Sequence, residues 1–170
     1  TVSAFGFQGQ KCSACSRVIV HEKVYDKFVE ILARKADALK VGDATDWTNY
    51  MGPVVNKSSH VSIMSYINKG ISEGGRLVAG GVTAGSDGYF IRPTVIADVD
   101  PKATISQEEI FGPVLAVIKA KNFDEGLKIA NNTEFGLTGA VYTKNKKRLE
   151  KAEKEFFVGN LYLNRKCTGA

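Results

Sequence analysis

Cysteine, histidine, proline and tryptophan are all scarce in this 170-residue sequence, which has three, two, four and one of them. Because three is an odd number, the cysteines cannot all be paired in disulfides within the chain. We take the cytoplasm as the default location, since disulfides are rare there. Cys12 and Cys15 are spaced C-x-x-C, which fits a redox pair or half of a zinc site. A zinc site needs four ligands, and the other candidates, Cys167, His21 and His60, follow no ligand spacing. We therefore predict no metal site.

The sequence also lacks a long apolar run, a phosphate-binding glycine motif and a basic patch interleaved with aromatic residues. No run approaches the ~20 apolar residues that span a bilayer, and no secretory signal is recognisable, so we expect no membrane partner. Neither G-x-x-x-x-G-K-[ST] nor G-x-G-x-x-G occurs, which leaves residues 80–88 as a glycine-rich surface loop. The net charge is +5, but the cations of residues 146–155 alternate with acids, as on a solvated helix face. We expect no nucleic-acid partner.

Hydrophobic periodicity predicts strands that alternate with helices. Short β-branched runs indicate strands, and apolar residues three and four apart indicate helices. The predicted strands are 16–20, 76–79, 114–118, 139–142 and 160–163. Residues 89–99 are predicted to be extended, and Pro93 makes part of them an edge or irregular strand. Three predicted helices are 24–39, 122–130 and 145–156. A fourth is capped by Asn56 or Ser58 and ended by Gly74-Gly75, and residues 41–53 and 101–112 are predicted to be irregular. The alternation favours an α/β fold, a mainly parallel sheet covered on both faces in three layers, in one domain.

The stretch most suggestive of chemistry is F-G-F-Q-G-Q-K-C-S-A-C-S-R, from Phe5 to Arg17. It places a cysteine just after two glycines, with Lys11 and Arg17 on either side. Nearby cations favour the thiolate, which is the reactive form of cysteine. From these residues alone Cys12 or Cys15 could be a nucleophile, and a small buried side chain is an equal reading. A thioredoxin-like pair would open a helix, but the segment that follows reads as a strand.

Four motifs, in this order along the whole chain, resemble the signatures of the aldehyde dehydrogenase superfamily. The first is F-x-x-x-G-Q-x-C-x-x-x-[ST]-R, which starts at Phe5, and the second is E-x-F-G-P, which starts at Glu109. The others are Asn131-Asn132 with Phe135-Gly136-Leu137, and Gly159 to Asn164. Two segments together, Gly9 to Ala14 and Asn164 to Ala170, resemble one branch of this superfamily, the 1-pyrroline-5-carboxylate (glutamate-semialdehyde) dehydrogenases. The second segment, N-R-K-C-T-G-A, is the more distinctive of the branch.

This resemblance implies an NAD-dependent enzyme that oxidises L-glutamate γ-semialdehyde to glutamate in proline and arginine catabolism. It implies that Cys12 is the nucleophile, which forms a thiohemiacetal and then a thioester. The backbone N–H of Cys12 would supply part of an oxyanion hole. Glu109 would accept a hydrogen bond from the nicotinamide ribose, and Phe111 would pack beside that ribose and the nicotinamide ring.

The same resemblance implies a substrate site made of Ser13 and the backbone of Gly169 and Ala170, which would hold the substrate's α-carboxylate. Cys15 is then expected to be packing, and Cys167 receives no catalytic role. The dinucleotide-binding domain, the general-base glutamate and the oxyanion-hole asparagine are expected upstream of residue 1. We therefore expect residues 1–170 to be the catalytic domain of a longer, homo-oligomeric enzyme, inactive by itself, whose partner is a small aldehyde.

Three alternatives remain open from the sequence. The first is an aldehyde dehydrogenase for another aldehyde, and the second is a cysteine hydrolase or acyltransferase, which would need His21 or His60 beside its nucleophile. The third is a non-catalytic interaction domain, in which Cys12 would react as an ordinary thiol.

Overall fold

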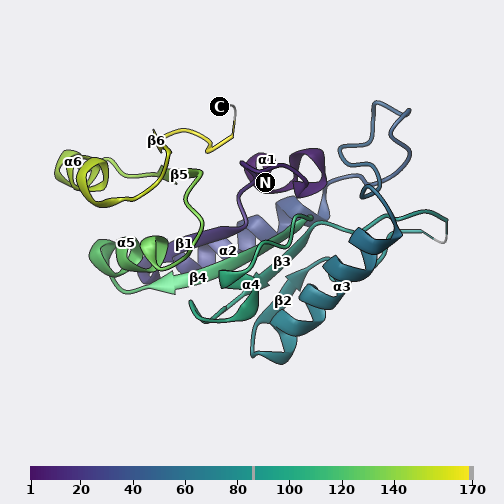
Figure 1. Cartoon of the computed structure of the whole chain (residues 1–170), viewed down its shortest axis with the longest axis horizontal. Coiled ribbons are helices and arrows are strands. Elements are labelled where there is room, and N and C mark those ends of the chain that lie inside the picture. The colour runs from purple at the N-terminus through teal and green to yellow at the C-terminus, as the bar shows by residue number, and fades with distance from the viewer. Residues whose placement is uncertain (86, 169–170) are drawn as a thin grey trace.

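The computed structural model describes residues 1–85 and 87–168. In the first half the elements are α1 (Val2–Phe5), η1 (Gly6–Gly9), β1 (Arg17–His21), α2 (Glu22–Asp37), α3 (Lys57–Ser72) and β2 (Arg76–Ala79). In the second half they are β3 (Thr94–Ala97), α4 (Thr104–Gln107), β4 (Val114–Ala120), α5 (Phe123–Asn131), β5 (Thr138–Val141), α6 (Lys146–Glu155) and β6 (Asn160–Leu163) (Figure 1). Among these helices, none combines the length and the apolar composition that crossing a membrane requires.

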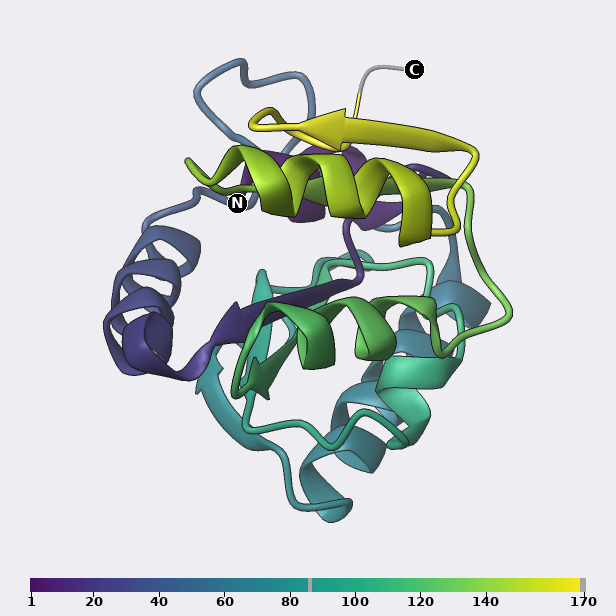
Figure 2. The ribbon, with the colours of Figure 1, turned by 90° about the vertical axis from the view of Figure 1, so that its left-hand side faces the viewer.

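A four-stranded sheet in the order β1-β4-β3-β2 forms the centre of the molecule. Strand β4 pairs in parallel with β1 and β3, and β2 runs antiparallel to β3 at the edge. Helix α2 packs on one face, and α3, α4 and α5 pack on the other (Figure 2). The predicted α/β fold, with a mainly parallel sheet between two helical layers, is confirmed.

Strand β4 is buried on both faces and divides the core into two clusters. Leu115 and Val117 pack into the cluster that contains α2. Val114, Ala116 and Ile118 pack into the cluster that contains α3 and α4. This is why the strand reads as a continuous apolar run rather than an alternating one.

The last two strands form a separate sheet. Strands β5 and β6 pair in parallel with each other, are joined by α6, and share no ladder with the central sheet in the described residues. The sequence predicted one sheet, and the structure has two. Periodicity identified both segments as extended, but it carries no information about which strand each one pairs with.

Side-chain caps fix the helix starts. Asn56 rather than Ser58 caps α3, because its Oδ1 accepts a hydrogen bond from the Ser59 N–H at 2.8 Å. Asn122 caps α5 in the same way, with the Glu125 N–H as donor at 2.9 Å. Each cap satisfies an amide that the first helical turn leaves free.

Residues 89–99 and 101–112 refine the sequence prediction. Of the two predicted effects of Pro93, an edge or an irregular strand, the structure has the second: residues 92 and 93 lie in no strand, and β3 begins one residue later as an internal strand. The ladder loses nothing there, since the Thr94 N–H donates to the Pro113 carbonyl at 2.8 Å. The irregular segment 101–112 contains the single helical turn α4.

Candidate active site

Cys12 and Ser13 occupy the two central positions of a tight turn. The Ala14 amide closes this turn by donating to the Lys11 carbonyl at 3.0 Å. Cys12 is exposed and Ser13 is half-buried. Within the described residues, the amides of Cys12 and Ser13 donate none of the hydrogen bonds that join turns and loops. The Cys12 side chain is therefore open to a small molecule, and its backbone N–H is not used to close the turn.

Gly9 brings the cysteine loop against the E-x-F-G-P loop. Its φ is +67°, and a side-chain carbon at this position would lie 2.2 Å from the carbonyl oxygen of Gly112. Only glycine allows the two backbones to approach so closely. Phe7 and Gln8 also have positive φ, 55° and 57°, a conformation that is costly for non-glycine residues and clusters at functional loops. The structure thus joins two motifs that are far apart in the sequence.

Two glutamines anchor the cysteine loop on its other side. The Gln8 side-chain amide donates to the Pro53 carbonyl at 3.0 Å. The Gln10 Oε1 accepts from the Val55 N–H, also at 3.0 Å. In the sequence, Gln10 is one residue of the cysteine motif and residues 41–53 are a long loop, so neither of these hydrogen bonds was predicted.

Glu109 and Phe111 both face solvent. Phe111 is 44% exposed and has a φ of 53°. Glu109 is exposed and joins no salt bridge or side-chain hydrogen bond found among the described residues. A free carboxylate can accept hydrogen bonds from sugar hydroxyls, and an exposed aromatic ring offers a flat apolar surface. The two side chains therefore present a hydrogen-bond acceptor and a flat apolar surface to solvent.

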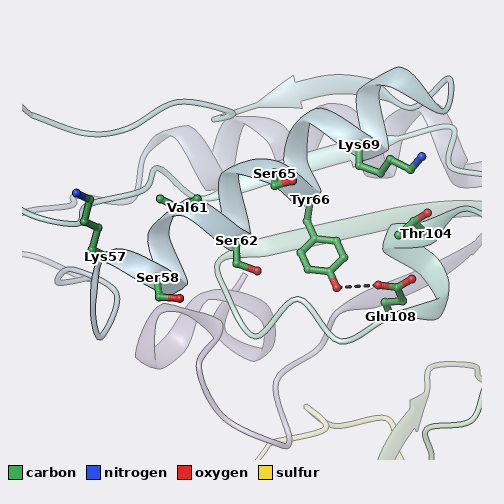
Figure 3. Close-up of a pocket in the computed structure, with 9 residues that line it drawn as sticks. All are labelled: Lys57, Ser58, Val61, Ser62, Ser65, Tyr66, Lys69, Thr104 and Glu108. Carbon is green, nitrogen blue, oxygen red and sulfur yellow. Dashed lines mark hydrogen bonds between the residues drawn. The ribbon is translucent and has the colours of Figure 1, made fainter.

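The neighbouring acid, Glu108, has a partner that the sequence did not reveal. The Tyr66 hydroxyl donates to its Oε2 at 2.7 Å, and this bond, followed by burial, raises the pKa of Tyr66. Both residues line an open groove of about 880 Å³ along α3 (Figure 3). Its other lining residues are Lys57, Ser58, Val61, Ser62, Ser65, Lys69 and Thr104. Neither Cys12 nor Ser13 lines it, so we do not assign the reaction to this groove.

The C-terminal segment returns to the cysteine loop. Cys167 and Thr168 are buried, with 7% and 3% of their surface exposed. The Cys15 amide donates to the Ser3 carbonyl at 2.9 Å, which ties the cysteine loop to α1. In Figure 1 the chain after β6 runs toward α1.

The predicted substrate residues are described only in part. Ser13 lies on the turn beside the nucleophile, whereas Gly169 and Ala170 lie outside the described residues. The contribution of that segment to a substrate site therefore stays a prediction.

The histidines serve other purposes. His21 caps α2, since its Nδ1 accepts from the Lys23 N–H at 3.2 Å. His60 lies on α3, where its ring packs at 6.3 Å from that of Tyr89. No contact joins either one to Cys12 in the described residues, so a Cys–His hydrolase pair is not supported. Among those residues, no three His, Cys, Asp or Glu side chains gather as metal ligands.

The whole chain, residues 1–170, matches the description of the aldehyde dehydrogenase family. It belongs to this family. The assignment made from four short motifs is thereby confirmed, and the two loops that meet at Gly9 and Gly112 carry two of these motifs.

Relatives with a more specific name share most of the sequence. The chain is 59% identical over 169 residues to 1-pyrroline-5-carboxylate dehydrogenase 1 of Halalkalibacterium halodurans, which covers 99% of the chain and 33% of that protein. It superposes with a TM-score of 0.95 on a 1-pyrroline-5-carboxylate dehydrogenase from Thermus with bound NAD, at 51% identity over 99% of the chain and 32% of that structure. It also superposes with a TM-score of 0.94 on proline utilization A (PutA) from Bdellovibrio bacteriovorus, at 46% identity over 99% of the chain and 17% of that structure. The chain spans about a third of the length of the first two.

Proposed function

We propose that this chain supplies the nucleophile, and part of the substrate and cofactor contacts, of an NAD-dependent 1-pyrroline-5-carboxylate dehydrogenase. Such an enzyme oxidises L-glutamate γ-semialdehyde to glutamate in the catabolism of proline and arginine. The observation that carries the proposal is the approach of Gly9 to Gly112, which brings the exposed Cys12 loop against the loop of Glu109 and Phe111. Relatives that bear this name are up to 60% identical to the chain.

Cys12 performs the covalent step. Its thiolate attacks the aldehyde carbon and forms a C–S bond, while the free N–H of Cys12 donates to the oxygen that becomes negative. NAD, when bound, would accept the hydride that leaves the substrate carbon, and the substrate would then remain on Cys12 as a thioester. Water then cleaves the C–S bond, releases glutamate and restores the thiol. We expect the general base for that water outside residues 1–170.

The neighbouring residues orient the reactants. The Glu109 carboxylate accepts hydrogen bonds from the nicotinamide ribose, and the Phe111 ring packs beside it. The Ser13 hydroxyl donates to the α-carboxylate of the substrate, together with the amides of Gly169 and Ala170. We further place the protein in the cytoplasm, since its three cysteines are free, as is usual in reducing compartments.

The test is an assay with glutamate semialdehyde and NAD on the full-length protein that contains this chain. Cys12→Ala should lower kcat/KM by roughly 10⁴-fold or more, because the covalent route is lost. Cys15→Ala is the matched control: it removes a thiol from the same loop without touching the reaction, and activity should stay within about twofold. Unchanged activity in Cys12→Ala would contradict the mechanism.

The same assay separates the alternatives. Residues 1–170 alone should give no NADH, and robust turnover by them would contradict the expected need for further segments. A better kcat/KM for an aldehyde without an α-carboxylate would favour another dehydrogenase. Alkylation of Cys12 in the full-length protein, no faster than that of an ordinary thiol, would favour a non-catalytic domain.

A further inference from the structure

Helix α3 lies directly against the E-x-F-G-P loop, which carries the two proposed cofactor contacts. A side-chain carbon at Gly70 of α3 would lie 2.6 Å from the Cδ1 atom of Ile105 in α4. At the other end of the loop, a side-chain carbon at Gly112 would lie 2.5 Å from the Cδ1 atom of Ile63, which also belongs to α3. Both isoleucines are buried. The helix therefore packs closely against both ends of residues 105–112, so its side chains can control how this segment sits.

Two polar contacts fasten the same helix to α4 and to the residue that follows α4. The Tyr66 hydroxyl donates to Oε2 of Glu108 at 2.7 Å (Figure 3). At the end of α3, the carboxylate of Glu73 accepts from the N–H and from the hydroxyl of Thr104, at 2.8 Å and 2.7 Å. Thr104 opens α4 and Glu108 follows its last residue. Each end of this helical turn is therefore bonded to α3 or to the residue that caps it.

Glu109 stands between two residues that face α3. Tyr66 holds Glu108, and Ile110 is buried in the core cluster that also contains residues of α3. The backbone of Glu108 is extended, with φ −109° and ψ 154°, and side chains alternate in direction along extended backbone. The Glu109 side chain is accordingly exposed, and within the part of the chain that the structure describes it does not line the groove that Glu108 lines. The direction of Glu109 thus depends on what holds its two neighbours.

We propose that Tyr66 and Glu108 are positioning residues: their hydrogen bond orients Glu109, the carboxylate that we assign to the nicotinamide ribose of NAD. The inference therefore rests on the proposed function. A hydroxyl bonded to a carboxylate makes one of the stronger hydrogen bonds of proteins, so its loss should let the Glu109 segment adopt several arrangements. The apparent affinity for a ligand falls in proportion to the fraction of molecules that keep the competent arrangement.

Calorimetric titration of NAD into the full-length protein, without substrate, tests this inference. Tyr66→Phe removes only the hydroxyl and should raise the Kd for NAD about fivefold to tenfold. Glu108→Ala removes the acceptor and should have the same effect, whereas Glu108→Gln keeps an acceptor oxygen and should restore most of the affinity. Ser65→Ala is the matched control, since it removes a hydroxyl from the neighbouring position of the same groove; the Kd should stay within about twofold.

ADP reports on the part of the cofactor that lacks the nicotinamide ribose. The Kd for ADP should stay within about twofold in all these variants, which also shows that they fold. A loss of ADP affinity equal to the loss of NAD affinity would overturn the proposal, because the effect would then not concern the ribose that Glu109 is proposed to bind.

A double-mutant cycle separates orientation of Glu109 from a general structural effect. Glu109→Gln should itself raise the Kd for NAD about tenfold, since it removes the charge of the acceptor. In that variant Tyr66→Phe should change the Kd by less than about twofold, because the carboxylate that it orients is gone. Equal effects of Tyr66→Phe with and without Glu109→Gln would overturn the positioning role.

The same titrations distinguish failure of this inference from failure of the proposed function. If Glu109→Gln leaves the Kd for NAD unchanged, the cofactor role of Glu109 is wrong and the positioning role is overturned with it. If Glu109→Gln weakens NAD binding but neither Tyr66→Phe nor Glu108→Ala does, the positioning role alone is overturned.

Discussion

Replacing Gly9 by alanine should damage activity far more than its size suggests. The added carbon would lie 2.2 Å from the Gly112 oxygen and 2.6 Å from the Gly112 carbonyl carbon. Real contacts of this kind are longer than 3.0 Å, and both neighbours are backbone, so one loop must move by about 1 Å. The movement would separate the Cys12 turn from the loop of Glu109 and Phe111.

The size of the effect follows from three contributions. Alanine at a φ of +67° costs about 1–2 kcal/mol in backbone conformation. Forcing an extra carbon into a packed site adds roughly 1–3 kcal/mol. A displacement of about 1 Å between reacting groups lowers the rate by on the order of 10²-fold. We expect the free energy of unfolding to fall by roughly 2–5 kcal/mol and kcat/KM by about 100-fold.

Gly74→Ala is the matched control. Gly74 also has a positive φ, +96°, but nothing lies within 4 Å of the added carbon, and it follows α3, away from the cysteine loop. It should lose only about 1–2 kcal/mol and keep its activity. Urea denaturation and steady-state kinetics on both variants would measure the difference. The reasoning is refuted if Gly9→Ala is no less stable than Gly74→Ala and keeps kcat/KM within twofold of the unmutated protein.

Two further predictions concern the substrate and the core. Ser13→Ala should raise KM for glutamate semialdehyde about tenfold, with little effect on an aldehyde that lacks the α-carboxylate, because a hydrogen bond to a charged group is worth about 1.5–3 kcal/mol; equal changes for both substrates would contradict the assignment. Burial raises the pKa of Tyr25 from 10.0 to about 12, so its neutral form stabilises the fold below pH 10 and this contribution is lost as the pH rises through about 12. The free energy of unfolding should fall by roughly 2 kcal/mol over that interval. Tyr25→Phe should weaken this pH dependence while costing about 1–2 kcal/mol at neutral pH, because the Tyr25 hydroxyl accepts from the Asp98 N–H at 2.7 Å. Urea denaturation across pH measures both, and an unchanged slope in the variant would contradict the cause.

Local structure was largely predictable from the sequence because its signals are local. Strands β2 and β6 have the predicted bounds, and Asn56, one of the two predicted candidates, caps α3. These features depend on side-chain periodicity and on the first few amides of a helix, which lie within one short window of residues.

The arrangement of the site could not be predicted from those windows. Cys12 and Cys15 lie in the same polar, glycine-rich context, and only the turn exposes one and half-buries the other. Likewise, Phe7 and Phe111 have a left-handed backbone that no propensity would assign to phenylalanine. Such conformations are maintained by tertiary contacts, so they become visible only when the loops are brought together.

Sequence motifs identified the family, which residue spacing alone did not, and the family match confirms it. The same resemblance favours Cys12 over Cys15 as the nucleophile, and this residue assignment stays a prediction. The resemblance did not predict the contacts of the other motif residues, such as the hydrogen bonds of Gln10 to Val55 and of Asn164 to Thr143. These contacts are structural and hold loops in place.

The position of β4 in the chain also sets the timing of folding during synthesis. Strand β1 is made before β4, yet in the described residues it pairs only with β4, whose first residue is Val114. At about 5–20 residues per second, the ribosome would need roughly 5–20 s to make the intervening segment. Throughout that interval β1 has no ladder partner, and unpaired apolar strands are prone to aggregate. Slower translation between β1 and β4 should therefore lower the soluble yield, even though it changes no contact in the folded protein.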